Sequence, residues 1–172
     1  MQPVRSDAFD DLFRTFERTA FHLELKDSYH TPHEADPFDL FMKGQHDDFA
    51  WHQPWLRLVR EATQAGKSIT RVRVVTVPHS DYTRWGLTVA HLNIGVGEDI
   101  RWLPRHLTSG IVFPADDYWL FDDSRVVFTV FEDDGRFAGG METFNSETIE
   151  QCRKVYGQVW KLAIPHAEYA SM

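Results

Sequence analysis

Apolar residues recur at helical spacing in the first third of the chain, and Pro and Gly mark where these segments begin and end. The spacing predicts a first helix with Asp10 and Asp11 in its first turn, where acidic side chains are favourable. Its apolar positions are Phe9, Leu12, Phe13, Phe16, Ala20 and Leu23. Pro37 predicts a short second helix that stops near Gly44, and Pro54 a longer one that ends at Gly66.

Two further helices are predicted later in the chain. One is capped by Ser80 or Asp81 and fades at Gly95 and Gly97, and the last is capped by Ser146. The last helix carries an apolar stripe that predicts packing against a sheet, with Tyr156 and Trp160 buried there. The stripe is Ile149, Cys152, Tyr156, Val159, Trp160 and Ala163.

β-Branched and aromatic runs between the helices predict strands. The alternation of Phe21, Leu23 and Leu25 indicates a short strand, and "SITRVRVVTV" indicates a buried strand that carries two arginines. Shorter strands are expected at "EDIRWLP", "DYWLF", "RVVFTVF" and "RFAGGMETF", with a hairpin turn at "EDDG". Residues 30–37 and 105–116 are predicted to be loops.

This order of elements predicts an α+β (mixed α/β) fold in which helices layer a mixed sheet. At 172 residues, the chain is expected to form one domain, 1–172. Residues 1–66 form its mainly helical part, and residues 67–172 form the sheet-containing part with the last helix.

Composition narrows the classes of protein that fit. The net charge is −8, but residues 50–105 carry 8 bases and 4 acids while both flanks are acidic. Overall acidity argues against direct nucleic-acid binding, and no apolar run approaches the roughly 20 residues of a membrane span. With a single cysteine, Cys152, the chain has no internal disulfide and no cysteine-rich metal site. We expect a cytoplasmic protein without a cofactor or membrane contact.

The stretch "RVRVVTVPHSDYTRWGL" is the strongest candidate site. A strand that leads into a helix places its connecting loop where ligands gather in open α/β sheets, and a helix N-terminus attracts anions. The ligand-binding residues expected for a small anion are therefore Arg71, Arg73, His79, Ser80, Tyr82 and Arg84. His79, Asp81 and Arg84 are the only candidates for catalysis.

An architectural interpretation of the same stretch is equally coherent. Ser80 or Asp81 would cap the helix, Arg84 would pair with Asp81 one turn away, and Tyr82 and Trp85 would enter the core. The histidines around residues 30–36 lack the helical spacing of a zinc site, so no metal is expected there. The paired aspartates of the second half suit turns better than calcium binding.

Segments that run in order along nearly the whole chain resemble an uncharacterised actinobacterial family described only as a domain of unknown function. They include "FDDLFRTFERTAFHLEL", "HSDYTRWGL", "GEDIRWLPR" and "DGRFAGG". The resemblance implies a regulatory or partner-binding role, because such proteins are commonly encoded beside Xre-type helix-turn-helix regulators.

Residues 117–163 also resemble the later half of a phospholipase-D-like domain. The active motif of that superfamily is His-x-Lys-x4-Asp. If Asp122 is the motif aspartate, Asp117 and Ala115 occupy the lysine and histidine positions; if it is Asp123, Tyr118 and Asp116 occupy them. In either register the resemblance implies the fold without its usual chemistry.

These observations favour a non-catalytic regulatory or interaction protein. It would act with a helix-turn-helix regulator and sense a small anionic ligand. These observations are also compatible with a homodimer. The alternative is a hydrolase that acts on a phosphoester or similar anion through the His79–Arg84 loop. The two differ in geometry, since the hydrolase requires His79, Asp81 and Arg84 to converge on one cleft.

Overall fold

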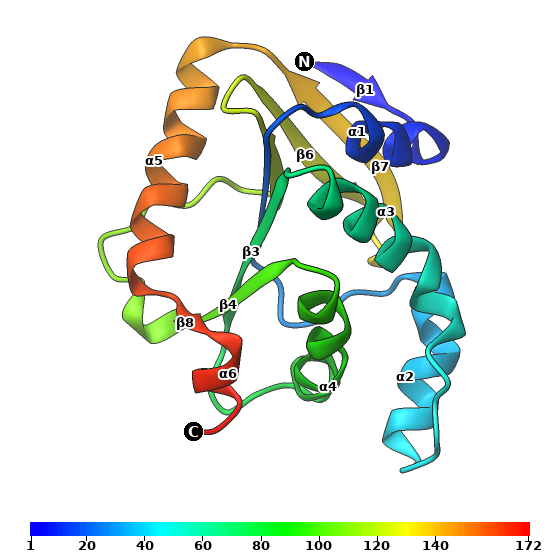
Figure 1. Cartoon of the computed structure of the whole chain (residues 1–172). Helices are drawn as coiled ribbons and strands as arrows, with labels where there is room; N and C mark the ends of the chain where they lie inside the picture. The colour runs from blue at the N-terminus through cyan, green and yellow to red at the C-terminus, as the bar shows by residue number, and fades with distance from the viewer.

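A computed structural model describes the whole chain, residues 1–172, as a mixed eight-stranded sheet with helices on both faces (Figure 1). The strand order is β1-β7-β6-β5-β2-β3-β4-β8. The strands are β1 (Gln2–Val4), β2 (Thr19–Glu24), β3 (Ser68–Val75), β4 (Asp99–Pro104), β5 (Tyr118–Phe121), β6 (Arg125–Phe131), β7 (Phe137–Thr143) and β8 (Ile164–Pro165). The helices are α1 (Phe9–Thr15), α2 (Ala35–Met42), α3 (Gln53–Gln64), α4 (Asp81–Gly95), α5 (Ser146–Leu162) and α6 (His166–Tyr169).

The sheet is parallel at its centre and antiparallel on both sides. β3 lies between β2 and β4 and is parallel to both, whereas β5 runs antiparallel to β2. The hairpins of β5, β6 and β7 continue the sheet on one side, where β1 pairs antiparallel with β7 and forms the edge. The two-residue β8 forms the other edge. β2, from the mainly helical part of the chain, therefore lies in the middle of the sheet. This α+β arrangement in one domain confirms the predicted fold class.

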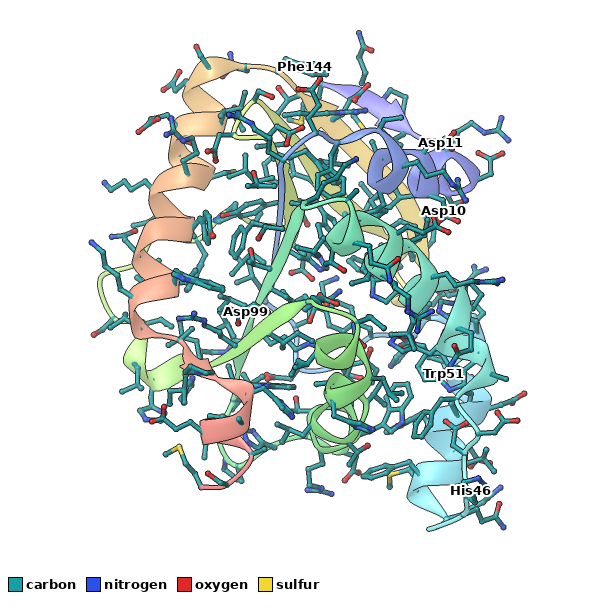
Figure 2. All side chains as sticks on the ribbon, in the orientation of Figure 1. Asp10, Asp11, His46, Trp51, Asp99 and Phe144 are labelled. Carbon is teal, nitrogen blue, oxygen red and sulfur yellow. The ribbon has the colours of Figure 1, made fainter.

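Two apolar layers hold the helices to the sheet. α5 covers one face, where Ile149, Cys152, Val155 and Val159 pack against strand residues such as Leu23. α1 and α3 cover the other face over β2 and β5, and α4 covers it over β3 and β4 (Figure 1). α2 projects beside α4, and His46, just after α2, lies at the tip of this projection (Figure 2). None of the helices combines the length and apolar character that crossing a bilayer requires.

The central strands explain one difference from the predicted pattern. The first helix ends at Thr15, and Ala20 and Leu23 lie in β2 rather than in a helix. β2 is buried on both faces, because the polar His22 and Glu24 that alternate with Phe21 and Leu23 are buried as well. Ala20 and Leu23 also fit the three- and four-residue spacing that continues from Phe16, which is why the helical pattern extended too far.

The last helix differs in two details. Asn145, not Ser146, is its N-cap, because the Asn145 side chain accepts a hydrogen bond from the Thr148 N–H. Tyr156 and Trp160 are only half-buried, at the border of the apolar layer. Tyr156 stacks on Phe21 at 3.9 Å between ring centroids, and the Arg101 guanidinium lies 3.7 Å from the centroid of the Trp160 ring.

Candidate functional site

The sheet face beneath α3 and α4 carries a cluster of buried charges. In β3, alternation turns Arg71 and Arg73 toward this face, while Val72 and Val74 turn toward α5. The parallel register sets Arg73 beside Glu24 at the end of β2. Arg71 Nη1 donates to Glu24 Oε1 at 2.7 Å, and Arg71 Nε donates to Glu98 Oε1 at 2.7 Å. Two arginines and two carboxylates thus share one buried network.

Ionisation within this network is fixed by its partners. Burial opposes the ionisation of Glu24, but Arg73 and Arg71 outweigh it and lower the pKa of Glu24 to about 2. Arg71 is buried and hydrogen bonded through Nε and Nη1, and its guanidinium lies 5.7 Å from the Trp119 ring centroid and 5.9 Å from that of Trp55. Each charge in the cluster therefore has an opposite charge or an aromatic face beside it.

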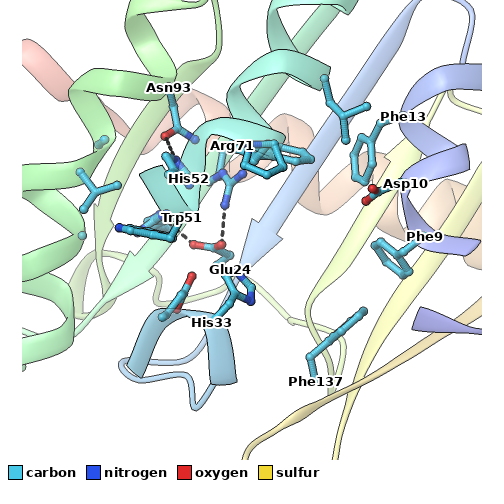
Figure 3. A pocket seen from close by; sticks show the side chains of 18 of the residues that line it. Phe9, Asp10, Phe13, Glu24, His33, Trp51, His52, Arg71, Asn93 and Phe137 are labelled. Atoms are coloured by element: carbon cyan, nitrogen blue, oxygen red, sulfur yellow. Dashed lines mark hydrogen bonds and ion pairs between the residues drawn. The ribbon is translucent and has the colours of Figure 1, made fainter. Parts of the chain in front are cut away.

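A cavity of about 590 Å³ lies over this network, between the sheet and helices α1, α3 and α4 (Figure 3). Its aromatic wall consists of Trp51, Trp55, Trp85, Trp119 and Tyr82. One end is polar, with Arg71, Glu24, His52 and Asn93 close together. The other end is formed by Phe9, Phe13 and Phe137, with the exposed Asp10 at its edge. The cavity is therefore amphipathic along its length.

Hydrogen bonds connect the polar end to the buried charges. Asn93 Nδ2 donates to Glu98 Oε2 at 2.7 Å, and Asn93 Oδ1 lies 2.6 Å from His52 Nε2. Burial lowers the pKa of His52, so its imidazole is neutral near pH 7. On the opposite wall, the Tyr82 hydroxyl donates to Glu34 Oε2 at 2.8 Å, and burial raises the pKa of Glu34.

The structure separates the residues predicted to bind a ligand into two groups. Arg71, Arg73 and Tyr82 line the cavity, but His79, Ser80 and Arg84 do not. Ser80 caps α4 by accepting from the Thr83 N–H at 3.0 Å and donates to the Asp27 carbonyl, and Arg84 pairs with Asp81. His79 lies between the Thr76 carbonyl and the Tyr169 hydroxyl. The groups of this loop thus have partners within the protein.

Several cavity residues did not stand out in the sequence as ligand contacts. Glu24 and Asn93 lie inside a predicted strand and helix, and their partners come from other segments. The six tryptophans of the chain were a usable signal, because four of them line this cavity.

His30 and His33 do not lie together in the structure, since His30 contacts the Asp134 carbonyl and His33 lines the cavity. No group of three or more His, Cys, Asp or Glu side chains is arranged to hold a metal ion.

The aspartates at the positions of the phospholipase-D motif stabilise the backbone. Asp122 accepts hydrogen bonds from the backbone N–H groups of Glu17, Arg18 and Thr19, at 2.7–2.9 Å. Asp117 is buried and accepts from the Leu25 N–H and from the Tyr29 hydroxyl. Burial raises the pKa of Asp117 to about 6.

His22, behind the cavity wall, is a buried side chain with unsatisfied polar atoms. It stacks on Trp119 with ring centroids 4.1 Å apart, and neither ring nitrogen makes a hydrogen bond. Burial is the main reason that its pKa falls to about 3. The folded protein therefore holds a neutral imidazole that has lost its water without gaining a hydrogen bond, although Nδ1 lies 3.5 Å from Glu24 Oε1.

We expect His22→Phe to stabilise the protein by about 1–3 kcal/mol at pH 7, because it removes the unsatisfied polar group and keeps the stack. The direction of the pH dependence follows from the lowered pKa of His22. Below about pH 6.5 the unfolded chain protonates His22 while the folded chain does not until about pH 3, so the wild type loses stability over this window. The advantage of the variant should grow as pH falls. Urea titrations at pH 7 and 5 measure the stability difference between wild type and variant, and the substitution of the exposed His46 by Phe is the control. Equal stability of wild type and His22→Phe at both pH values would contradict the prediction.

The comparisons with known proteins bear on family and fold. No curated protein matches the chain. Among solved structures, NucT from Helicobacter pylori aligns with a TM-score of 0.54 at 11% identity, covering 92% of this chain and 91% of that one. Phosphatidylserine synthase from Haemophilus influenzae Rd KW20 aligns with a TM-score of 0.51 at 9% identity. That alignment covers 95% of this chain but spans only 38% of the synthase chain.

Both structures are phospholipase-D-like neighbours, and at these identities they show the fold alone. They agree with the fold class predicted from the last strands and helix. The family model described as "Domain of unknown function (DUF6879)" matches residues 7–171, so the chain belongs to the DUF6879 family over nearly its whole length.

Proposed function

We propose that this protein is a non-catalytic regulatory protein that binds a small planar molecule in its aromatic cavity. The observation that carries this proposal is the gathering of four tryptophans around one cavity of about 590 Å³ above a fixed network of charges. A pocket of that size with mainly aromatic walls and a few placed polar groups is typical of small-molecule sites. Indole rings stack well on other planar rings, which favours a flat ligand.

The side chains of the cavity support binding more than catalysis. Its wall contains no cysteine or lysine, and its one serine, Ser6, is exposed at the edge. Both arginines are balanced by carboxylates rather than free to stabilise a developing negative charge. His79, Asp81 and Arg84, which the hydrolase alternative requires in one cleft, do not line this cavity.

The regulatory part of the proposal rests on the family resemblance. Proteins of this kind are commonly encoded beside helix-turn-helix regulators, so we propose such a regulator as the partner that responds to ligand binding. Trp51 and His52 lie in the segment between α2 and α3 and form one side of the cavity (Figures 2 and 3). A ligand that contacts Trp51 would change the conformational freedom of this segment. The segment would thereby connect ligand binding in the cavity to the protein surface.

A thermal-shift screen against planar aromatic compounds tests the binding. At 100 times its Kd, a ligand adds about 2.7 kcal/mol of stability, which for a domain of this size raises Tm by roughly 5–10 °C. We expect at least one compound to stabilise the wild type and to lose most of this effect in Trp51→Ala, which removes a ring stacked near Trp85.

Trp160→Ala is the matched control, because Trp160 is also half-buried but belongs to the α5 face. It should keep the full ligand-dependent shift. The proposal fails if no compound raises Tm, or if Trp51→Ala keeps the same shift as the wild type.

A further inference from the structure

Five side chains that line the cavity follow one another in a closed ring of neighbours. Glu34 Oε2 accepts from the Tyr82 hydroxyl, and the Tyr82 ring lies 5.5 Å from the Trp85 ring at an angle of 70°. Trp85 stacks on Trp51 with ring centroids 5.5 Å apart. The Trp51 ring lies 6.2 Å from that of His33, which precedes Glu34 in the chain. One carboxylate therefore lies in an aromatic part of the cavity wall.

Glu34 differs from the other carboxylates of the polar network because it has no ion pair. Its only hydrogen bond from the protein comes from the Tyr82 hydroxyl, and its Oε1 atom is neither hydrogen bonded nor closed off from solvent. Burial raises the pKa of Glu34 more than the Tyr82 hydroxyl, His33 and Arg73 lower it. The protein thus compensates the negative charge of Glu34 only in part.

The other charges of the cavity do not supply the missing partner. Glu24 pairs with both guanidiniums of the wall, at 2.7 Å from Arg71 Nη1 and 2.8 Å from Arg73 Nε. The carboxylates of the cavity and of the network behind it are Asp10, Glu24, Glu34 and Glu98. Histidines apart, four carboxylates therefore face two guanidiniums. This negative excess disfavours an anionic ligand and favours a cationic one.

The aromatic rings beside Glu34 favour the same kind of ligand. The face of a Trp or Tyr ring attracts a cation within about 6 Å of its centroid, and the attraction is stronger where water is excluded. Trp85 is buried, and Trp51 and Tyr82 are half-buried. Trp51 and His33 lie on the same side of the cavity as Glu24, away from Phe137 (Figure 3). A cation beside Glu34 would thus lie among aromatic rings that are shielded from water.

We propose that the ligand of this cavity carries a positive charge, as an ammonium or similar organic cation attached to its planar body. The cation lies beside Glu34, whose carboxylate is its counter-charge, and contacts the rings of Trp51, Tyr82 and Trp85. The planar body extends toward the other tryptophans of the wall. This inference rests on the proposed ligand-binding function and specifies the chemical class of its ligand.

Three probes with the same indole ring and different head groups test the charge of the ligand. They are the cationic tryptamine, the uncharged tryptophol, in which a hydroxyl replaces the ammonium, and the anionic indole-3-acetate. Isothermal titration calorimetry with the wild-type protein measures their Kd values at pH 8, above the ordinary pKa of histidine. We expect tryptamine to bind about tenfold or more tightly than tryptophol, and indole-3-acetate to bind most weakly.

Glu34→Gln tests the counter-charge. Glutamine keeps an acceptor oxygen for the Tyr82 hydroxyl but removes the negative charge. We expect this variant to bind tryptamine about tenfold more weakly and to leave the Kd of tryptophol within about twofold of the wild-type value.

Asp36→Asn is the matched control for Glu34→Gln. It also removes one negative charge, but from an exposed position in the first turn of α2 that does not line the cavity. It should leave both Kd values within about twofold, because exposed charges are screened by water and salt. Circular dichroism and Tm confirm that both variants fold; if Glu34→Gln does not, the comparison of tryptamine with tryptophol decides alone.

The outcomes distinguish the two proposals. Binding of tryptophol or indole-3-acetate as tight as that of tryptamine overturns the positive charge. Wild-type binding of tryptamine by Glu34→Gln, or an equal loss in Asp36→Asn, overturns the role of Glu34. If planar compounds raise Tm in the thermal-shift screen while tryptamine does not bind, the inference is wrong and the proposed function holds. If no compound of either set binds, the proposed function itself fails.

Discussion

Replacing Arg71 by Met should destabilise this protein by about 3–5 kcal/mol at pH 7. The substitution keeps an apolar stem of similar length but removes both hydrogen bonds of the guanidinium. Glu98 then keeps its hydrogen bond from Asn93 and Glu24 keeps its ion pair with Arg73, but each buried carboxylate has lost a charged partner. Urea unfolding, followed by the fluorescence of the tryptophans, measures the loss.

The loss should depend on pH in a definite direction. The pKa of Glu24 is lowered to about 2 from an ordinary value of 4.5, so its ionised form stabilises the fold above about pH 4.5. This contribution disappears as pH falls from about 4.5 toward 2. Without Arg71, Glu24 loses one of the two arginines that lower its pKa and protonates more readily. The difference between the wild type and the Arg71→Met variant should therefore shrink as pH falls from about 4.5 toward 2.

Arg84→Met is the matched control for Arg71→Met. Arg84 is exposed and pairs with Asp81 on the surface of α4, and such pairs contribute about 0–1 kcal/mol. Comparing the two variants separates the contribution of the buried network to stability from that of the loop that the sequence favoured as a site. If Arg71→Met is no more damaging than Arg84→Met, the buried network does not stabilise the fold as described.

Asp122→Ala should lower the free energy of unfolding by about 2–4 kcal/mol, although Asp122 lies in a surface turn. Its carboxylate accepts three backbone N–H groups at the start of the central strand β2, and hydrogen bonds to charged acceptors are the stronger ones. These N–H groups outweigh the opposing effect of burial and lower the pKa of Asp122. Its contribution is therefore present near neutral pH and is lost in acid.

Two controls isolate this capping role. Asp122 and Asp123 have φ angles of 51° and 55°, a region that alanine adopts with strain. Asp123→Ala thus carries the same backbone strain, but its carboxylate has only a distant contact with Arg153, so it should lose about 1–2 kcal/mol. Asp122→Asn keeps one acceptor oxygen and should lie between wild type and Asp122→Ala. Thermal and urea unfolding rank the three variants, and equal losses for Asp122→Ala and Asp123→Ala would contradict the capping role.

Elements with strong local signals could be predicted from the sequence. The bounds of α3 follow from Pro54 and from Gly66, which adopts φ 81° just after the helix. Ser80 was one of two residues expected to cap α4, and it is the N-cap. The short elements β1, β8 and α6 were not predicted. β8 has only 2 residues and α6 only 4, so neither carries a periodic pattern, and both form because the rest of the fold places them against β4.

The candidate site could be predicted only in part. Arg71, Arg73 and Tyr82, which were predicted to contact a ligand, line the cavity. Two arginines in a buried strand also require partners, which the sequence could indicate. The sequence could not show that these partners are Glu24 and Glu98, which lie 47 and 27 residues from Arg71. The His79–Arg84 loop drew attention for its polar side chains, but these are bonded within the protein. Their partners include near neighbours such as Asp81 and Thr76 and distant residues such as Asp27 and Tyr169.

By itself, the sequence determined the fold class and the presence of two arginines inside the sheet. Helical and strand periods, caps and turn residues act over a few positions, so they can be recognised without knowing the rest of the chain. Only the tertiary structure decided where the cavity lies and which groups face it. The register of β2 against β3 sets Glu24 beside Arg73, and the packing of α3 and α4 brings His52 to Asn93. The pairing of buried charges and the closure of an aromatic wall depend on contacts between distant segments, which a local pattern does not encode.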